Sequence, residues 1–254
     1  MQLFDKSLTA HSLLKYVRLF FSAFVTGGWI GVDLFFALSG FLVSGLLFNE
    51  YKKTGNIRSG RFLIRRGFKL YPSFILFIFL TFCFERVYAS VYHSGIYPLV
   101  SYLKDLFFLH NYFRGRWDHT WSLDVEEIFY FLLTAYLFLC IKYHKLNSRF
   151  FINTYIFLVI IGIIGRVIEY HFHPDFLDSR APYYSHTRLD SLFFGVLLSY
   201  FYNFNKEKCT SFFKKYKVAI VILSILFLLP NFVLKREDSH DAIDTIRLST
   251  NAVC

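Results

Sequence analysis

Charged residues are scarce in this 254-residue chain, and their scarcity excludes an ordinary soluble domain. Only 18 % of the residues are Asp, Glu, Lys or Arg, against about 25 % in a typical globular protein. Because 55 % are hydrophobic and 22 % aromatic, intrinsic disorder is excluded as well. Four cysteines without a CxxC pair exclude a disulfide scaffold, and 5 prolines with 13 glycines are too few for a fibrous chain. This composition is typical of a polytopic helical membrane protein.

Apolar segments recur along the whole chain, and crossing a bilayer takes about 20 such residues. Six segments are clear candidates: residues 30–48, 68–84, 122–141, 151–168, 188–204 and 217–234. Residues 11–27 are a weaker candidate, because two basic residues interrupt them. Residues 96–113 are predicted to be interfacial, re-entrant or a poorly apolar span. We therefore expect an all-α polytopic transmembrane bundle, a single domain over residues 1–254 that is incomplete at both ends.

Basic and acidic loops alternate between these segments. Three loops together hold 15 Lys or Arg and two acids: residues 49–69, 142–149 and 205–217. The intervening loops together hold nine Lys or Arg and 11 acids: residues 85–120, 169–190 and 235–247. Because basic loops stay cytoplasmic, the first set is predicted to face the cytoplasm and the second the exterior. The net charge of +10 is thus explained by membrane topology, without nucleic acid as a partner. The sequence predicts a multi-pass protein of the inner (plasma) membrane.

The most basic loop contains a helical stripe of cations. Arg58, Arg61, Arg65 and Lys69 are three or four residues apart, so they share one face if the segment is a helix. Such a stripe can attract a polyanion such as a nucleotide diphosphate. It can equally anchor the topology through anionic lipid head groups, and composition does not separate the two.

Acids also lie inside the apolar segments, where a carboxylate is costly unless it is paired or hydrated. Asp33 either has a functional partner or caps a helix N-terminus. Nearby, Gly40 and Ser44 are four residues apart, which predicts close approach of another helix.

Three acids enter the third segment. Asp124 and Glu127 are predicted to share one helix face, and Glu126 and Tyr130 another. This is more carboxylate than capping requires, so an inward-facing Glu is expected to orient a histidine or pair with an arginine. Arg188, at the start of residues 188–204, is either functional or part of a surface ion pair with Asp190.

Several enzyme signatures are absent from the sequence. It has no HExxH motif and no Cys/His spacing typical of zinc sites, so no metal is expected. It has no GxSxG elbow and no Walker loop, so a serine hydrolase or a P-loop NTPase is unsupported.

Four motifs occur in order along the chain: Gly31–Phe41 (GVDLFFALSGF), Arg65–Pro72 (RRGFKLYP), Trp121–Tyr130 (WSLDVEEIFY) and Thr187–Gly195 (TRLDSLFFG). They resemble, in the same order, those of the acyltransferase 3 family of integral membrane enzymes, which move acyl groups, commonly acetyl, onto cell-surface sugars. The resemblance is strongest over residues 28–200.

The resemblance implies a reaction and its site residues. The resemblance implies that the donor substrate is cytoplasmic acyl-CoA, commonly acetyl-CoA, that no cofactor is bound, and that the acceptor is a cell-surface polysaccharide or lipid-linked sugar. The implied catalytic residues are His11, Asp33 and Glu127. The implied substrate-binding residues are Arg65, Arg66, Lys69, Trp121 and Arg188. Lys69 stands where the family has an arginine, so it keeps the charge but lacks the bidentate fork for phosphate.

Two other functions stay open from the sequence. The chain can be a non-catalytic or degenerate relative that keeps the scaffold. A secondary transporter with an intramembrane carboxylate relay is less favoured, because the inverted repeats and broken helices of such folds are not evident.

Overall fold

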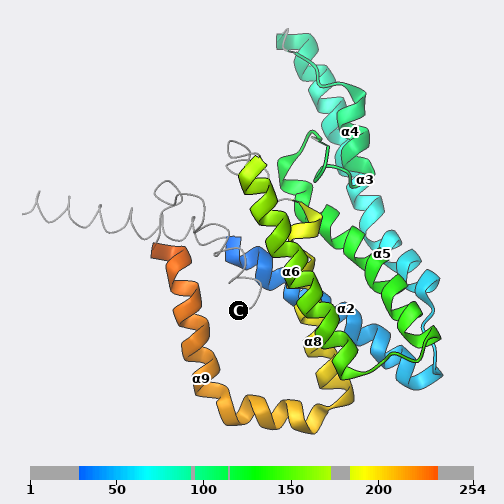
Figure 1. Cartoon of the computed structure of the whole chain (residues 1–254). Helices are drawn as coiled ribbons and strands as arrows, with labels where there is room; N and C mark the ends of the chain where they lie inside the picture. Colours follow the sequence, from blue (N-terminus) through cyan, green and yellow to red (C-terminus); the bar gives the residue numbers. More distant parts are fainter. Residues whose placement is uncertain (1–28, 93–94, 114, 173–183, 234–254) are drawn as a thin grey trace, which may run out of the picture.

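The computed structural model describes residues 29–92, 95–113, 115–172 and 184–233, in which every regular element is helical (Figure 1). The helices are α2 (Trp29–Thr54), α3 (Ser59–Tyr92), α4 (Leu99–Leu106), α5 (Trp121–Lys142), α6 (Ser148–Phe172), α8 (Leu189–Phe204) and α9 (Lys206–Val233). Two 3₁₀ turns, η1 (Asp118–Thr120) and η3 (Ser185–Thr187), precede α5 and α8. The predicted all-α helical bundle is confirmed.

Within the described residues, each of the six clear apolar segments falls on one helix, apart from Arg188, which immediately precedes α8. In the described part of the chain, three helical stretches are long and apolar enough to cross a membrane: Gly31–Thr54, Ser59–Tyr92 and Ser148–Glu169. α8 has only 16 residues, about 24 Å at 1.5 Å per residue, which is less than the roughly 30 Å of a bilayer core. α5 is a continuous helix, but three buried acids near its start interrupt its apolar sequence. The weaker candidate, residues 11–27, lies outside the described residues.

After α3, the chain folds back so that α4 packs against α3; the interfacial, re-entrant and poorly apolar alternatives for residues 96–113 stay predictions. α4 ends in a turn at Phe108, whose φ is 55° and whose ring stacks on Phe74 of α3 at 5.1 Å. Asp105 is fully buried and accepts backbone N–H bonds from Arg116 (2.8 Å) and Trp117 (3.3 Å). The carboxylate thus satisfies irregular backbone, which is tolerated at membrane depth only when buried in protein.

α2 and α8 approach closely because each presents a glycine to the other's backbone. A Cβ on Gly40 would overlap the carbonyl oxygen of Leu192, and one on Gly195 would overlap the carbonyl oxygen of Ala37. Ser44 is fully buried and donates to the Gly40 carbonyl at 2.6 Å. The close approach predicted at Gly40 is confirmed, and its partner is α8.

Replacing Gly195 by alanine is expected to destabilise the protein, because overpacking costs about 1–3 kcal/mol. At roughly 2–4 °C per kcal/mol, the unfolding temperature in detergent should fall by roughly 2–12 °C. The matched control is Gly31→Ala, since a Cβ there meets nothing within 4 Å. Helix propensity favours alanine at both positions, so equal unfolding temperatures in the two variants would contradict the close approach.

The three basic loops meet at one end of the bundle. The Lys52 ammonium at the end of α2 binds the side-chain oxygen of Asn203 near the end of α8 at 3.1 Å. The Tyr200 hydroxyl of α8 donates to the carbonyl of Leu146, between α5 and α6, at 3.4 Å. This arrangement agrees with a common side for these loops, and their cytoplasmic orientation stays a prediction.

Candidate functional site

A buried ion pair joins α2 to the start of α8. The Arg188 Nη1 and Asp33 Oδ1 atoms are 2.7 Å apart, and both side chains are 2 % exposed. Ser191 Oγ donates to the same carboxylate oxygen at 3.4 Å. Of the two roles predicted for Asp33, the structure therefore favours a paired residue over a simple helix cap.

A second buried ion pair joins α8 to α6. Arg166 Nη2 lies 2.6 Å from Asp190 Oδ2 and also donates to the carbonyl of Thr187 at 2.6 Å. Arg188 and Asp190 are only two residues apart, yet they bind different helices. The first turn of α8 thus ties α2 and α6 together, and the two charges are not a surface pair.

Asp124, at the start of α5, is the third buried carboxylate at this end of the bundle. It is fully buried and accepts a hydrogen bond from the backbone N–H of Asn111 at 3.3 Å. The Asn111 amide in turn donates to Ser185 Oγ of η3 at 2.9 Å. We call Asp33, Arg188, Arg166, Asp190, Asn111, Ser185 and Asp124 the outer polar cluster.

Some acceptor oxygens of the outer polar cluster are buried without a hydrogen-bond partner among the described residues. Within this cluster, they are Asp33 Oδ2, Asn111 Oδ1 and Asp124 Oδ1. A buried acceptor left unpaired costs about 1–3 kcal/mol, so these atoms are suited to accept hydrogen bonds from hydroxyl or N–H groups that enter the site.

A half-buried histidine borders this cluster. The ring of His186 stacks on Tyr112 at 6.0 Å and on Tyr184 at 5.4 Å. Burial lowers the pKa of His186, and the nearby positive charge of Arg166 lowers it further. The negative charge of Glu169 raises it, but not enough to offset the burial. The imidazole is therefore neutral near pH 7, as a group that accepts a proton must be.

A second group of polar side chains lies deeper between α2, α3 and α5, and we call it the inner polar cluster. The Tyr130 hydroxyl donates to Glu126 Oε2 at 3.0 Å and is hydrogen-bonded to Ser39 Oγ. The Arg66 guanidinium lies over the Tyr130 ring, 4.1 Å from its centroid. The predicted sharing of a helix face by Glu126 and Tyr130 is confirmed.

The three cations assigned to phosphate do not converge. Arg65 and Lys69, four residues apart on α3, are exposed, whereas Arg66 is half-buried and turned toward α5. The exposed pair is thus free to meet head groups or a soluble anion, and Arg66 alone reaches the interior.

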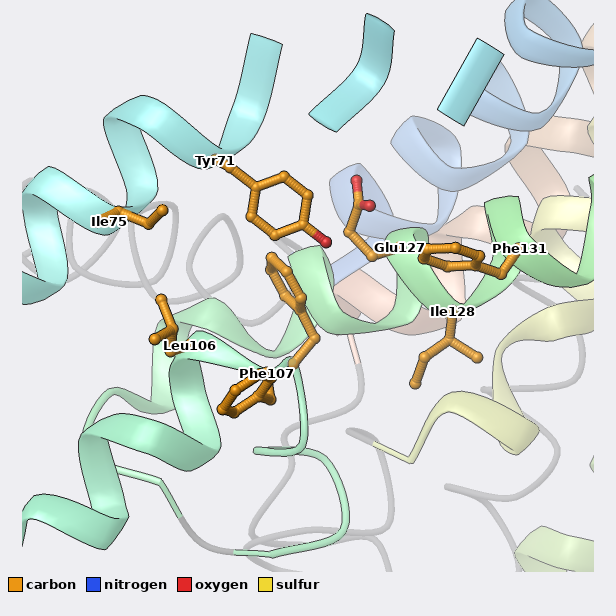
Figure 2. A pocket seen from close by; sticks show the side chains of 8 residues that line it. Tyr71, Ile75, Leu106, Phe107, Glu127, Ile128 and Phe131 are labelled. Carbon is orange, nitrogen blue, oxygen red and sulfur yellow. The ribbon is translucent and has the colours of Figure 1, made fainter. Parts of the chain in front are cut away.

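The remaining predicted site residues are Trp121, Glu127 and His11, and the structure does not bring the first two together. Trp121 is buried, with its ring 5.8 Å from that of Phe36 and 5.8 Å from the Arg188 guanidinium carbon. Glu127 is buried and lines a cavity between α3 and α5 (Figure 2). His11 lies outside the described residues. Within the described residues, no group of three or more His, Cys, Asp or Glu side chains could hold a metal ion.

An apolar helical bundle that encloses ion pairs and hydrogen-bonded hydroxyls is a membrane-type protein with an internal polar site. The chain belongs to the acyltransferase 3 family, whose acyltransferase domain matches residues 6–249. The resemblance seen in the four motifs is thereby confirmed.

Two curated proteins are similar in sequence to most of this chain. The chain is 29 % identical to the O-acetyltransferase OatA of Staphylococcus aureus over 215 residues, which cover 79 % of this chain and 34 % of that protein. It is 29 % identical to the peptidoglycan O-acetyltransferase OatA of Listeria monocytogenes over 192 residues, 71 % of this chain and 30 % of that protein. The chain thus spans about a third of the length of these relatives. No solved structure matches it.

Proposed function

We propose that the chain is the membrane-embedded part of an O-acetyltransferase of the inner (plasma) membrane. It transfers an acetyl group from cytoplasmic acetyl-CoA to a hydroxyl of an extracytoplasmic cell-wall carbohydrate. The family and the names of the two relatives support the reaction type and the carbohydrate acceptor. The donor and the direction of transfer are supported by the residue arrangement below.

The observation that carries the proposal is the presence of two polar clusters in one apolar bundle. α2 contributes Asp33 to the outer polar cluster and Ser39 to the inner one. α5 likewise contributes Asp124 to the outer polar cluster and Tyr130 to the inner one. Each pair is six residues apart, which is about 9 Å along a helix. Polar side chains therefore occur at two depths between the same two helices, as a route from an inner donor to an outer acceptor requires.

The chemistry needs a base near the outer cluster. The acceptor hydroxyl oxygen attacks the thioester carbonyl carbon, so a C–O bond forms, the C–S bond breaks and the thiolate of CoA leaves. A histidine takes the hydroxyl proton and returns it to the thiolate. The family resemblance assigns this role to His11, and the geometry offers neutral His186. The unpaired oxygen of Asp33 is suited to orient such an imidazole, and the bundle excludes water from the thioester.

Deleting the gene is expected to lower base-labile acetate in purified cell wall, and the wild-type gene should restore it. The His11→Ala and His186→Ala variants are compared in the same cells, with membrane insertion checked by immunoblot. The variant that lacks the base should lose roughly 10²–10⁴-fold of the transfer rate. Unchanged cell-wall acetate after deletion would favour the alternative, a non-catalytic relative.

A further inference from the structure

A cavity of about 450 Å³ lies between α3, the turn after α4 and α5. Its walls come from Tyr71, Ile75, Leu106, Phe107, Phe108, Glu127, Ile128 and Phe131. Figure 2 shows Ile75 and Tyr71 on α3 facing Glu127, Ile128 and Phe131 on α5. The volume is within the roughly 300–1,000 Å³ of small-molecule sites, which are mostly apolar with a few polar groups.

One buried carboxylate faces this apolar cavity. Glu127 is 6 % exposed, and its carboxylate makes no hydrogen bond to any side chain or backbone group that the structure describes. The Tyr71 hydroxyl is the other polar group of the lining, and Figure 2 shows it directed toward the Glu127 side of the cavity. A buried carboxylate is costly without hydrogen bonds, so the cavity is complementary to an apolar ligand that carries N–H or O–H donors.

A cation lies next to the same place. Arg66 interacts electrostatically with Glu127 and is half-buried and turned toward α5. A ligand whose narrow apolar part occupies the cavity can therefore place an anionic end near Arg66.

We propose that this cavity binds the pantetheine arm of the acyl-CoA donor, with Glu127 accepting hydrogen bonds from its amide N–H groups. The inference rests on the proposed function and specifies the donor site within it. The arm is a chain of methylene and methyl groups with two amide N–H donors, and its other end carries phosphates. A bilayer lipid tail would satisfy the apolar walls but would leave the carboxylate without a donor.

The test is binding of CoA to purified full-length protein in detergent, with adenosine 3′,5′-bisphosphate as the probe that lacks the arm. Ile75→Trp fills the cavity and should raise the Kd for CoA at least tenfold without changing the Kd for the bisphosphate. The matched control, Leu76→Trp, alters an exposed neighbour outside the lining and should leave both constants unchanged. Glu127→Leu should weaken CoA binding more than Glu127→Gln, which keeps an acceptor.

Three other results are informative. Equal CoA affinity in the Ile75→Trp and Leu76→Trp variants would overturn the assignment, and if Ile75→Trp instead loses only co-purified phospholipid, the cavity is a lipid site. Failure of the wild-type protein to bind CoA would remove both this inference and the proposed donor. CoA binding that depends on Ile75 in a protein without acetyl transfer would sustain the cavity assignment and overturn the proposed function.

Discussion

Replacing Arg188 by alanine should destabilise the protein by about 3–5 kcal/mol, because it leaves the Asp33 carboxylate buried without its cation. The control is Arg61→Ala, which breaks an ion pair of similar length with Glu50 (2.6 Å) whose arginine is 45 % exposed. Exposed pairs contribute only about 0–1 kcal/mol. Unfolding in detergent, followed by tryptophan fluorescence, should therefore separate the two variants by at least about 2 kcal/mol.

A double variant separates the structural role of this ion pair from its role in the reaction. Asp33→Asn with Arg188→Met removes both charges, so it should be more stable than Arg188→Ala alone. If the pair also serves the reaction, the double variant stays inactive although its stability is recovered. A double variant that unfolds as readily as the sum of its single variants would show that the two side chains are not coupled.

The apolar helices and the polar residues buried in them were predictable from the sequence because both are features of local composition. Apolar runs near the length of a bilayer span predicted helices, and the cost of Asp33 in such a run predicted a partner. The identity of the partner was not predictable, since Arg188 lies 155 residues away. Arg166 was missed altogether, although a lone arginine within an apolar segment was a signal that a buried acid must face it.

The spacing of two residues along one helix predicted a contact between them, but it did not predict what surrounds them when the neighbouring chain is irregular. Glu126 and Tyr130 bind each other, as four-residue spacing predicts. Asp124 and Glu127 are three residues apart but have different surroundings, because the non-helical chain around Asn111 reaches the first and the turn after α4 borders the second. Tertiary hydrogen bonds, for example those of Asp105, determine the path of this irregular segment. The spacing of residues in the sequence does not encode such bonds.

The ring of Tyr130 is expected to position Arg66 for donor binding. The hydroxyl of Tyr130 is expected to contribute to the free energy of unfolding through its hydrogen bond to Glu126. Removing the guanidinium in Arg66→Ala should cost about 2–5 kcal/mol of donor binding, a factor of roughly 30 or more. Tyr130→Leu removes the cation–π contact and should weaken donor binding by about 0.5–2 kcal/mol. Tyr130→Phe keeps the ring and should bind the donor nearly as wild type, as measured by the Kd for CoA.

The hydroxyl has a separate consequence that the same variants measure. Tyr130→Phe leaves Glu126 Oε2 without its donor, so unfolding should become easier by about 1–3 kcal/mol. Among the described residues, the Arg66 guanidinium has no hydrogen-bond acceptor, and its Nε is buried. The aromatic ring is therefore what fixes its plane while its donors stay available. Weak CoA binding in Tyr130→Phe with full binding in Tyr130→Leu would contradict this division, because it would make the hydroxyl the group that contacts the donor.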